Sequence, residues 1–406
     1  MENTPTKVYG YRWIVLLVFA VLNAVIEIHW VALAPITTEA AQYYAVTPLS
    51  IGFLSMLFML VYLAVSIPAS YVIDTYGIRV GVGAGAALIG IFGLLKGVYA
   101  ANYAMVSVCQ FGLAVAQPFI LNAYTAISAK WFPISQRATA TGLAALSQYI
   151  GIILAMAATP LLAHAWGIDG MLKTYGVISV VGAVLFLVFA KEAPPTPPSP
   201  PGQEERFLVI AGLKHMFKQK QVVLLLLMFL IGLGIFNAVT TWIEQILSPR
   251  GLDSTQAGAV GALMMIGGVL GASILPPISD KIRRRIPFLI TATAFTIPGL
   301  TGLAFATNFA VLLASSFVLG FFIMSAGPIG FQYGAELSYP APESTSQGLL
   351  LLAGQISGVA FIYGMDAFRS AGGSMTPFMI FFIAITALNV ILCTRLNESE
   401  MIKKAQ

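Results

Sequence analysis

One face of the first apolar segment carries the residues best suited to bind a charged group. At about 100° per residue, four side chains fall on one narrow stripe of a helix: Asn23, Glu27, Trp30 and Ala34. A carboxylate in a segment that crosses a bilayer costs about 2.5–3.5 kcal/mol, so we expect Glu27 to face a functional cavity. The alternative is a protonated carboxyl group bonded to a neighbouring helix. An indole beside a carboxylate binds a desolvated cation with about 2 kcal/mol of cation–π energy, so the stripe favours a cation site.

Three amide side chains lie near the centres of other apolar segments. Gln117 is central in the segment 103–129, Asn237 lies in 221–247, and Gln355 is central in 346–368. Hydrocarbon offers no hydrogen-bond partner, so an amide at this depth either bonds to another helix or faces a polar cavity. Because their depth agrees with that of Glu27, we predict that these amides and Trp30 form one substrate site.

The composition indicates the class of protein in which these residues act. Of the 406 residues, 58% are apolar and only 9% are charged, whereas soluble domains carry about 25% charged residues. Such a chain cannot cover a water-facing surface, which excludes an ordinary soluble enzyme, a disordered chain and a nucleic-acid binder. At about 20 residues per bilayer crossing, the sequence predicts an all-α, polytopic membrane protein.

Apolar runs between prolines, glycines and charges predict twelve transmembrane helices in two six-helix halves. The first six spans are expected at 13–36, 48–73, 79–99, 103–129, 138–164 and 170–190. The second six are expected at 221–247, 256–279, 286–306, 309–334, 346–368 and 375–394.

The basic residues predict the orientation in the membrane. Of the 21 Lys and Arg residues, 17 fall on the side of the termini, and the four on the other side are Lys96, Lys173, Arg250 and Arg369. By the positive-inside rule, both termini are cytoplasmic, in a cell membrane. The basic charge thus reports topology, and no nucleic-acid partner is expected.

The two halves repeat. Asp74 and Asp280 are 206 positions apart, and so are Gly142 and Gly348. Such a duplication places a substrate site at the interface of the halves. We predict an N-terminal half over 1–190, a Pro-rich cytoplasmic linker with an amphipathic helix over 191–220, and a C-terminal half over 221–406.

The loops at the two aspartates predict gate residues. Asp74, Gly77 and Arg79 combine a carboxylate, a turn glycine and a basic residue between two spans, and Asp280 begins the second copy, which lacks the glycine. A carboxylate here can cap a helix start and pair with arginine, and that pairing breaks when the inner face opens. The pattern resembles the loop motif of the major facilitator superfamily, although Ser70 stands where that motif usually has glycine.

A closer resemblance covers most of the chain. The segments that carry it are 11–15, 54–62, 68–77, 116–121 and 335–340, together with Gly348, Leu349 and Gln355. They resemble the branch of this superfamily related to the feline leukaemia virus subgroup C receptor. The resemblance implies import of choline or ethanolamine, and haem export has also been assigned to members. It implies a quaternary-ammonium pocket, which Trp30, Gln117 and Gln355 match, whereas Asn237 stands at or next to the place of an aromatic residue.

We therefore predict a monomeric, secondary active, alternating-access transporter of a small organic solute, preferably a choline- or ethanolamine-like cation. The alternative is a transporter of haem or of a neutral or anionic metabolite, coupled to protons through Glu27. A non-transporting receptor is a further alternative, which the short loops disfavour. The sequence offers no histidine cluster, nucleophile–base pair or metal-ligand set, so we expect no enzymatic activity, cofactor or metal.

Overall fold

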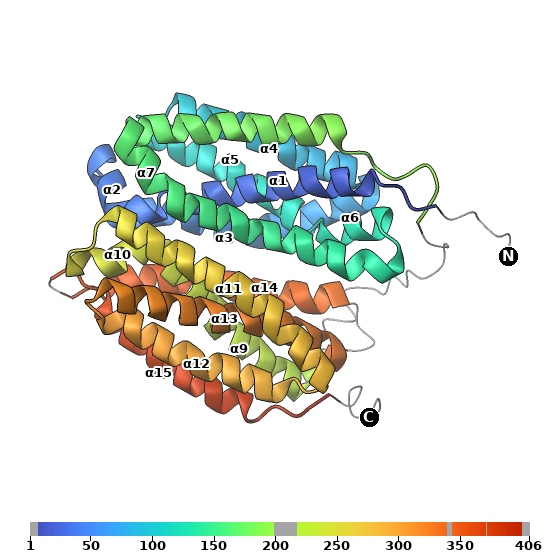
Figure 1. The fold of residues 1–406 in the computed structure, drawn as a ribbon. Coiled ribbons are helices and arrows are strands. Elements are labelled where there is room, and N and C mark those ends of the chain that lie inside the picture. Colours follow the sequence, from blue (N-terminus) through green and yellow to red (C-terminus); the bar gives the residue numbers. More distant parts are fainter. Residues whose placement is uncertain (1–6, 199–216, 339–342, 371, 400–406) are drawn as a thin grey trace. The chain divides into compact units, whose positions relative to one another are not determined.

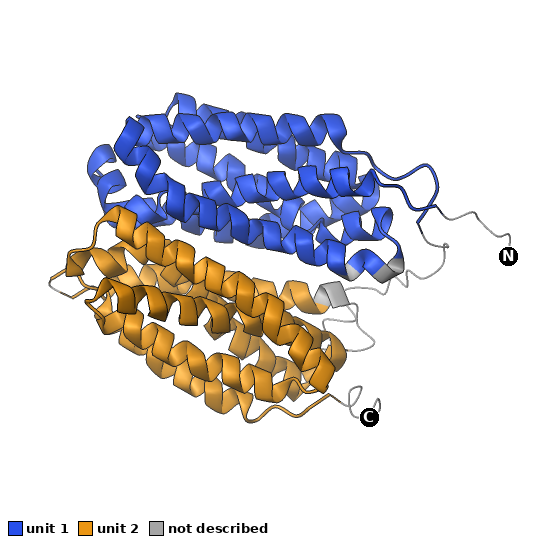
Figure 2. Cartoon of the chain, viewed as in Figure 1, with its two compact units in different colours: residues 1–204 blue, residues 205–406 orange. Residues whose placement is uncertain are grey.

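The computed structural model describes residues 7–198, 217–338, 343–370 and 372–399. The chain divides into two compact units, unit 1 over Met1–Glu204 and unit 2 over Glu205–Gln406 (Figure 2). Throughout the described residues the regular elements are helices (Figure 1). Most of the linker and amphipathic helix predicted over 191–220 lies outside the described residues, because the structure does not describe 199–216.

Unit 1 consists of long apolar helices, two of which begin at side-chain N-caps. Thr47 and Asn102 accept the backbone N–H of the residue three positions later, and Pro48 occupies the first turn of its helix, where its missing N–H costs nothing. The elements are α1 (Arg12–Val31), η1 (Ala34–Ile36), α2 (Thr37–Tyr44), α3 (Pro48–Tyr76), α4 (Ile78–Val98), α5 (Tyr103–Leu121), α6 (Tyr124–Trp131) and α7 (Ile134–Phe189).

Helix α7 contains two of the predicted spans. Its apolar part, Thr139–Phe189, has 51 residues, which at 1.5 Å per residue would be about 77 Å long, more than twice the hydrocarbon thickness of about 30 Å. Gly167 interrupts it with φ 70° and ψ 169°, a conformation that side chains disfavour. The eleven long apolar helices of the described chain thus provide the twelve predicted crossings.

Unit 2 repeats this architecture. A capping box between Asp253 and Gln256 begins its second long helix, and each residue satisfies a backbone N–H at the helix start. The elements are α9 (Lys220–Thr241), α10 (Ile243–Leu247), η2 (Ser248–Arg250), α11 (Ser254–Ile282), α12 (Ile286–Phe305), α13 (Phe309–Ser338), α14 (Glu343–Ala367) and α15 (Thr376–Cys393).

Glycines set the closest helix crossings within each unit. A Cβ on Gly320 of α13 would lie 1.7 Å from the carbonyl oxygen of Met264 in α11, and one on Gly271 would lie 1.9 Å from that of Phe321. In unit 1, a Cβ on Gly151 would lie 2.2 Å from the carbonyl oxygen of Ala24. These backbones pack at a distance that only glycine permits, as is common where membrane helices cross closely.

We expect Gly320→Ala to lower the apparent melting temperature of the purified protein by several degrees, because overpacking a close contact costs about 1–3 kcal/mol. Gly232→Ala in α9 is the matched control, since a Cβ there meets no atom within 4 Å. Equal melting temperatures for the two variants, measured by scanning fluorimetry in one detergent, would contradict this packing account.

Candidate functional site

The end of α1 is held by side chains of neighbouring helices. Because α1 ends at Val31, its last carbonyls have no donor one turn later. Ser55 Oγ of α3 donates to the carbonyl oxygen of Trp30 at 3.0 Å, and Gln110 Nε2 of α5 donates to that of His29 at 3.0 Å. The chain then turns through η1, so the turn that carries Trp30 is fixed by bonds from two other helices.

Glu27 and Gln117 form the centre of the polar group in unit 1. Gln117 Nε2 donates to Glu27 Oε1 at 2.9 Å, and both side chains are buried. Within the described residues, Glu27 forms no ion pair with a basic side chain. A buried carboxylate bonded to an amide alone keeps acceptor capacity for a cation or a proton. Trp30 is also buried, one turn further along the face of Glu27.

Asn23, on the same stripe, is engaged in helix contacts. Its Nδ2 donates to the carbonyl oxygen of Ala144 at 3.0 Å and to Ser147 Oγ at 2.8 Å, and its Oδ1 accepts from the Tyr124 hydroxyl at 3.2 Å. These bonds join α1 to α6 and α7. Asn23 therefore joins helices within the stripe, and the binding roles of Glu27 and Trp30 stay predictions.

The two predicted site residues of unit 2 lie on neighbouring helices. Asn237 Nδ2 of α9 donates to the carbonyl oxygen of Gly354 at 3.3 Å, directly before Gln355 of α14. A Cβ on Gly234 would lie 2.4 Å from Ser357 Oγ, so the helices pack closely at this height. The Gln355 side chain is half-buried and forms no hydrogen bond within the described part of the chain, and its role in a substrate site stays a prediction.

A separate charged cluster lies at the far end of these helices. Arg369 Nε donates to Asp366 Oδ1 at 2.8 Å and Nη1 donates to Gln245 Oε1 at 2.8 Å, while the guanidinium lies 5.2 Å from the centre of the Trp242 ring. Gln245 in turn donates to Glu244 at 2.6 Å. Asp366 and Glu244 are thus both engaged in this cluster.

The fourth predicted span is interrupted by a polar break at Asn122, which the sequence did not predict. Between α5 and α6, Asn122 accepts the hydroxyl of Tyr62 at 2.9 Å and donates to Ser66 and Ser70 of α3. Ser70 stands where the loop motif usually has glycine, and here it supplies a hydrogen-bond partner to Asn122 at 2.9 Å. The proline four residues before Asn122 was the available sequence signal.

In unit 1, Glu192 is the carboxylate that reaches the predicted gate loop. It accepts the backbone N–H of Ile78 at 3.2 Å and of Arg79 at 2.7 Å, which caps α4, and it pairs with Lys130. Gly77 has φ 92°, and a Cβ on it would lie 2.2 Å from Glu192 Oε1. Asp74 and Arg79 have exposed side chains and form no ion pair within the described residues, so their gate role stays a prediction.

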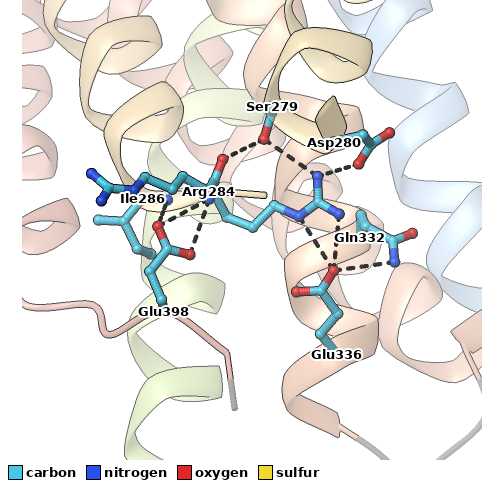
Figure 3. A network of polar contacts seen from close by, with 8 residues as sticks. Ser279, Asp280, Arg284, Ile286, Gln332, Glu336 and Glu398 are labelled. Carbon is cyan, nitrogen blue, oxygen red and sulfur yellow. Dashed lines mark hydrogen bonds and ion pairs between the residues drawn. The ribbon is translucent and has the colours of Figure 1, made fainter. Parts of the chain in front are cut away.

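Unit 2 builds a denser network at the corresponding place (Figure 3). The buried Arg285 guanidinium pairs with Asp280 and, at 3.0 Å, with Glu336, and Glu398 accepts the backbone N–H groups of Arg285 and Ile286 at 3.0 Å. Burial acts to lower the pKa of Arg285, but the bonds to Asp280 and Glu336 outweigh it and raise the pKa above its ordinary value.

These networks extend the internal repeat to two more pairs of positions. Glu192 and Glu398 are 206 positions apart, and so are Lys130 and Glu336. The sequence analysis missed both capping glutamates, although the same offset could have found them. The charge at the second pair is reversed, so Lys130 pairs with a carboxylate in unit 1 whereas Glu336 pairs with an arginine in unit 2.

Comparison with known proteins identifies the family. A family model described as Major Facilitator Superfamily matches residues 9–362. The chain belongs to the Major Facilitator Superfamily. This multi-pass membrane protein is therefore a transporter, and the bacterial homologue of the human lysosomal transporter Spinster, inward-facing and unoccupied, has the same fold. That structure has a TM-score of 0.75 at 14% identity, over 96% of this chain and 98% of its own.

Two relatives confirm the predicted resemblance within the superfamily. Solute carrier family 49 member A3 of Xenopus tropicalis is 30% identical over 381 residues, which are 89% of this transporter and 78% of the relative. The choline/ethanolamine transporter FLVCR2 of Rattus norvegicus is 26% identical over 429 residues, which cover 100% of this transporter and 78% of the relative. The transporter is thus related to the FLVCR family.

The Glu192 cap gives the transporter a pH-dependent stability. Its partial burial acts to raise the pKa of Glu192, but the bonds from Lys130 and from the backbone of Arg79 and Ile78 lower it below the ordinary 4.5. A carboxyl group with a lowered pKa stabilises the fold above its unfolded pKa, and this stabilisation is lost as pH falls through the folded pKa.

We expect the apparent melting temperature to fall more steeply between pH 6 and pH 3.5 in the wild type than in Glu192→Gln, because the variant has already lost the ionised cap. Asp74→Asn, at an exposed carboxylate that forms no ion pair within the described residues, controls for general acidification. Parallel curves for the wild type and Glu192→Gln would show that the cap does not contribute.

Proposed function

We propose that this transporter moves a small organic cation of the choline or ethanolamine class by secondary active, alternating access. The observation that carries the proposal is the buried carboxylate of Glu27, which is bonded to Gln117 at 2.9 Å and lies one turn from Trp30. A carboxylate provides charge and an indole face provides cation–π attraction for an ammonium group that has left water. The relative FLVCR2, a choline/ethanolamine transporter, supports the same class of substrate.

In this proposal the amides bind the polar remainder of the solute. The side-chain amide of Gln355 forms no hydrogen bond in the described structure. Asn237 donates one N–H to the carbonyl oxygen of Gly354, and its side-chain oxygen can still accept a hydrogen bond. An ethanolamine or choline hydroxyl both donates and accepts, which matches an amide. Because Asn237 stands at or next to the place of an aromatic residue, we propose that the ammonium group is bound mainly by Glu27 and Trp30.

The second candidate is proton-coupled transport of haem or of a neutral or anionic solute, with Glu27 as the proton carrier. The same observation favours it, since a protonated Glu27 also accepts from Gln117. The two candidates differ in the role of charge: a fixed counter-ion requires an ionised Glu27 for cation binding, whereas a proton carrier requires its titration for transport.

We also propose that the transporter lies in the cell membrane, acts as a monomer and has both termini in the cytoplasm. The excess of basic residues on the side of the termini supports this orientation. In this orientation the Glu192 and Arg285 networks lie at the cytoplasmic ends of the spans, and Asp74, Gly77, Arg79 and Asp280 belong to the gate that opens there.

We expect Glu27→Gln and Trp30→Ala each to weaken choline binding by about tenfold or more, because each removes an attraction of about 1–2 kcal/mol. Radiolabelled choline binding to purified protein at pH 6 and pH 8 measures the effect. Glu39→Gln and Trp166→Ala are matched controls, since Glu39 pairs with His164 and the Trp166 side chain is exposed.

Three outcomes separate the candidates. Wild-type choline binding that both substitutions weaken supports the cation site. Wild-type affinity in both variants overturns the site assignment. Unchanged choline binding in Glu27→Gln, together with loss of pH-dependent uptake of another solute, supports the proton carrier instead.

We expect Asn237→Tyr to raise the affinity for choline by about threefold to tenfold relative to Asn237→Leu, because a second aromatic face adds about 0.5–1.5 kcal/mol. The leucine variant loses the same bond to Gly354 without adding a ring, so the comparison isolates cation–π attraction. Equal affinities in the two variants would show that position 237 does not contact the ammonium group.

A further inference from the structure

Unit 1 contains a lysine that is fully buried near the end of α4. Lys96 has no exposed surface, and its Nζ donates to Gln110 Oε1 of α5 at 2.6 Å. Within the described residues it forms no ion pair with a carboxylate. A buried amine is costly to keep in an apolar span, so its single hydrogen-bond partner is informative.

Gln110 connects Lys96 to α1 through hydrogen bonds. With its oxygen bonded to Lys96, its Nε2 donates to the carbonyl oxygens of His29 at 3.0 Å and of Leu54 at 3.2 Å. Lys96 therefore determines which end of the amide faces the two carbonyls. If the amide turned over, its oxygen would face the carbonyl oxygens, and the end of α1 would lose a donor that the helix does not supply.

A second bond to His29 comes from α7 and does not depend on Lys96. The Ser179 hydroxyl donates to the carbonyl oxygen of Tyr175 at 2.8 Å and lies 2.6 Å from His29 Nε2. Since serine has only one proton, Nε2 is the donor in the bond to Ser179. This bond offers a control in the same cluster, because it holds the His29 ring and leaves the chain from Lys96 to the α1 carbonyl intact.

The corresponding helices of unit 2 lack this series of hydrogen bonds. At the offset of 206, Lys96 corresponds to Gly302 in α12 and Gln110 corresponds to Ser316 in α13. Gly302 packs directly on the side chain of Ser315, so a glycine suffices to join these two helices. The lysine and glutamine are thus not required by the architecture, and they occur in the unit that carries Glu27 and Trp30.

We propose that Lys96 is a positioning residue that, by orienting Gln110, holds the last turn of α1 and hence the Trp30 indole in its binding position. The inference rests on the proposed function for its effect on the solute. Its effect on α1 does not, since the bonds that carry it join groups of the protein itself.

The test compares Lys96→Met, Gln110→Leu and their double variant with the control Ser179→Ala. Choline affinity and hydrogen–deuterium exchange of the peptide over 28–33 are measured on full-length protein. We expect Lys96→Met and Gln110→Leu each to weaken choline binding about tenfold and to speed exchange over 28–33. The double variant should be no worse than either single variant, and Ser179→Ala should stay within twofold of the wild type.

Gln110→Glu keeps the inference testable if Lys96→Met does not fold. The carboxylate still pairs with the buried Lys96 amine but cannot donate to His29 and Leu54, so this variant should keep the packing of α4 while losing affinity and exchanging faster over 28–33. Wild-type affinity and exchange in Gln110→Glu would overturn the inference, as would equal effects of Ser179→Ala and Lys96→Met. If the wild type does not bind choline, the proposed function fails, and the exchange data alone decide the role of Lys96.

Discussion

A bilayer interior offers no hydrogen-bond partner, and this constraint explains where the polar residues of the transporter lie. Every backbone carbonyl freed by a helix end inside the membrane must be satisfied by a side chain of the protein. The end of α1 is the clearest case, because Gln110 and Ser55 bond its last carbonyls. Asn122 meets the same demand at the break between α5 and α6. Glu27 bonds to no backbone carbonyl of this kind, since its contact is with the Gln117 side chain, and this sets it apart from Gln110, Ser55 and Asn122.

The polar networks of the two units follow the internal duplication only in part. Each unit caps its third long helix with a glutamate from the segment after its last span, Glu192 in unit 1 and Glu398 in unit 2. The partner charges differ, since Lys130 corresponds to Glu336. Both units therefore cap a helix with a glutamate but form different ion pairs beside the cap. We expect a change of pH or salt to affect the stability of the two networks unequally.

Apolar runs between prolines, glycines and charges predicted the spans well, because every residue of a span is selected for an apolar surrounding. The Gly167 break between two spans was also predictable from the lengths involved. The offset of 206 could have singled out Glu192 and Glu398, but it does not indicate that Glu192 caps α4, because Glu192 lies more than a hundred residues from Ile78. For the candidate site, helical periodicity placed Glu27 and Trp30 on one face. It did not indicate that Asn23 is used in helix contacts or that Gln117 bonds to Glu27.

The contact between Gly77 and Glu192 couples the two positions in any series of substitutions. A side chain at 77 would lie 2.2 Å from the carboxylate and would also be strained by the φ of 92°, whereas a change at 192 leaves the Gly77 backbone as it is. In unit 2 the corresponding turn residue is Arg283, with φ 57°, and the cap begins one residue further along, at Arg285. Removal of the carboxylate relieves only the contact and not the strain, so we expect substitutions at 77 and 192 to have non-additive effects on stability.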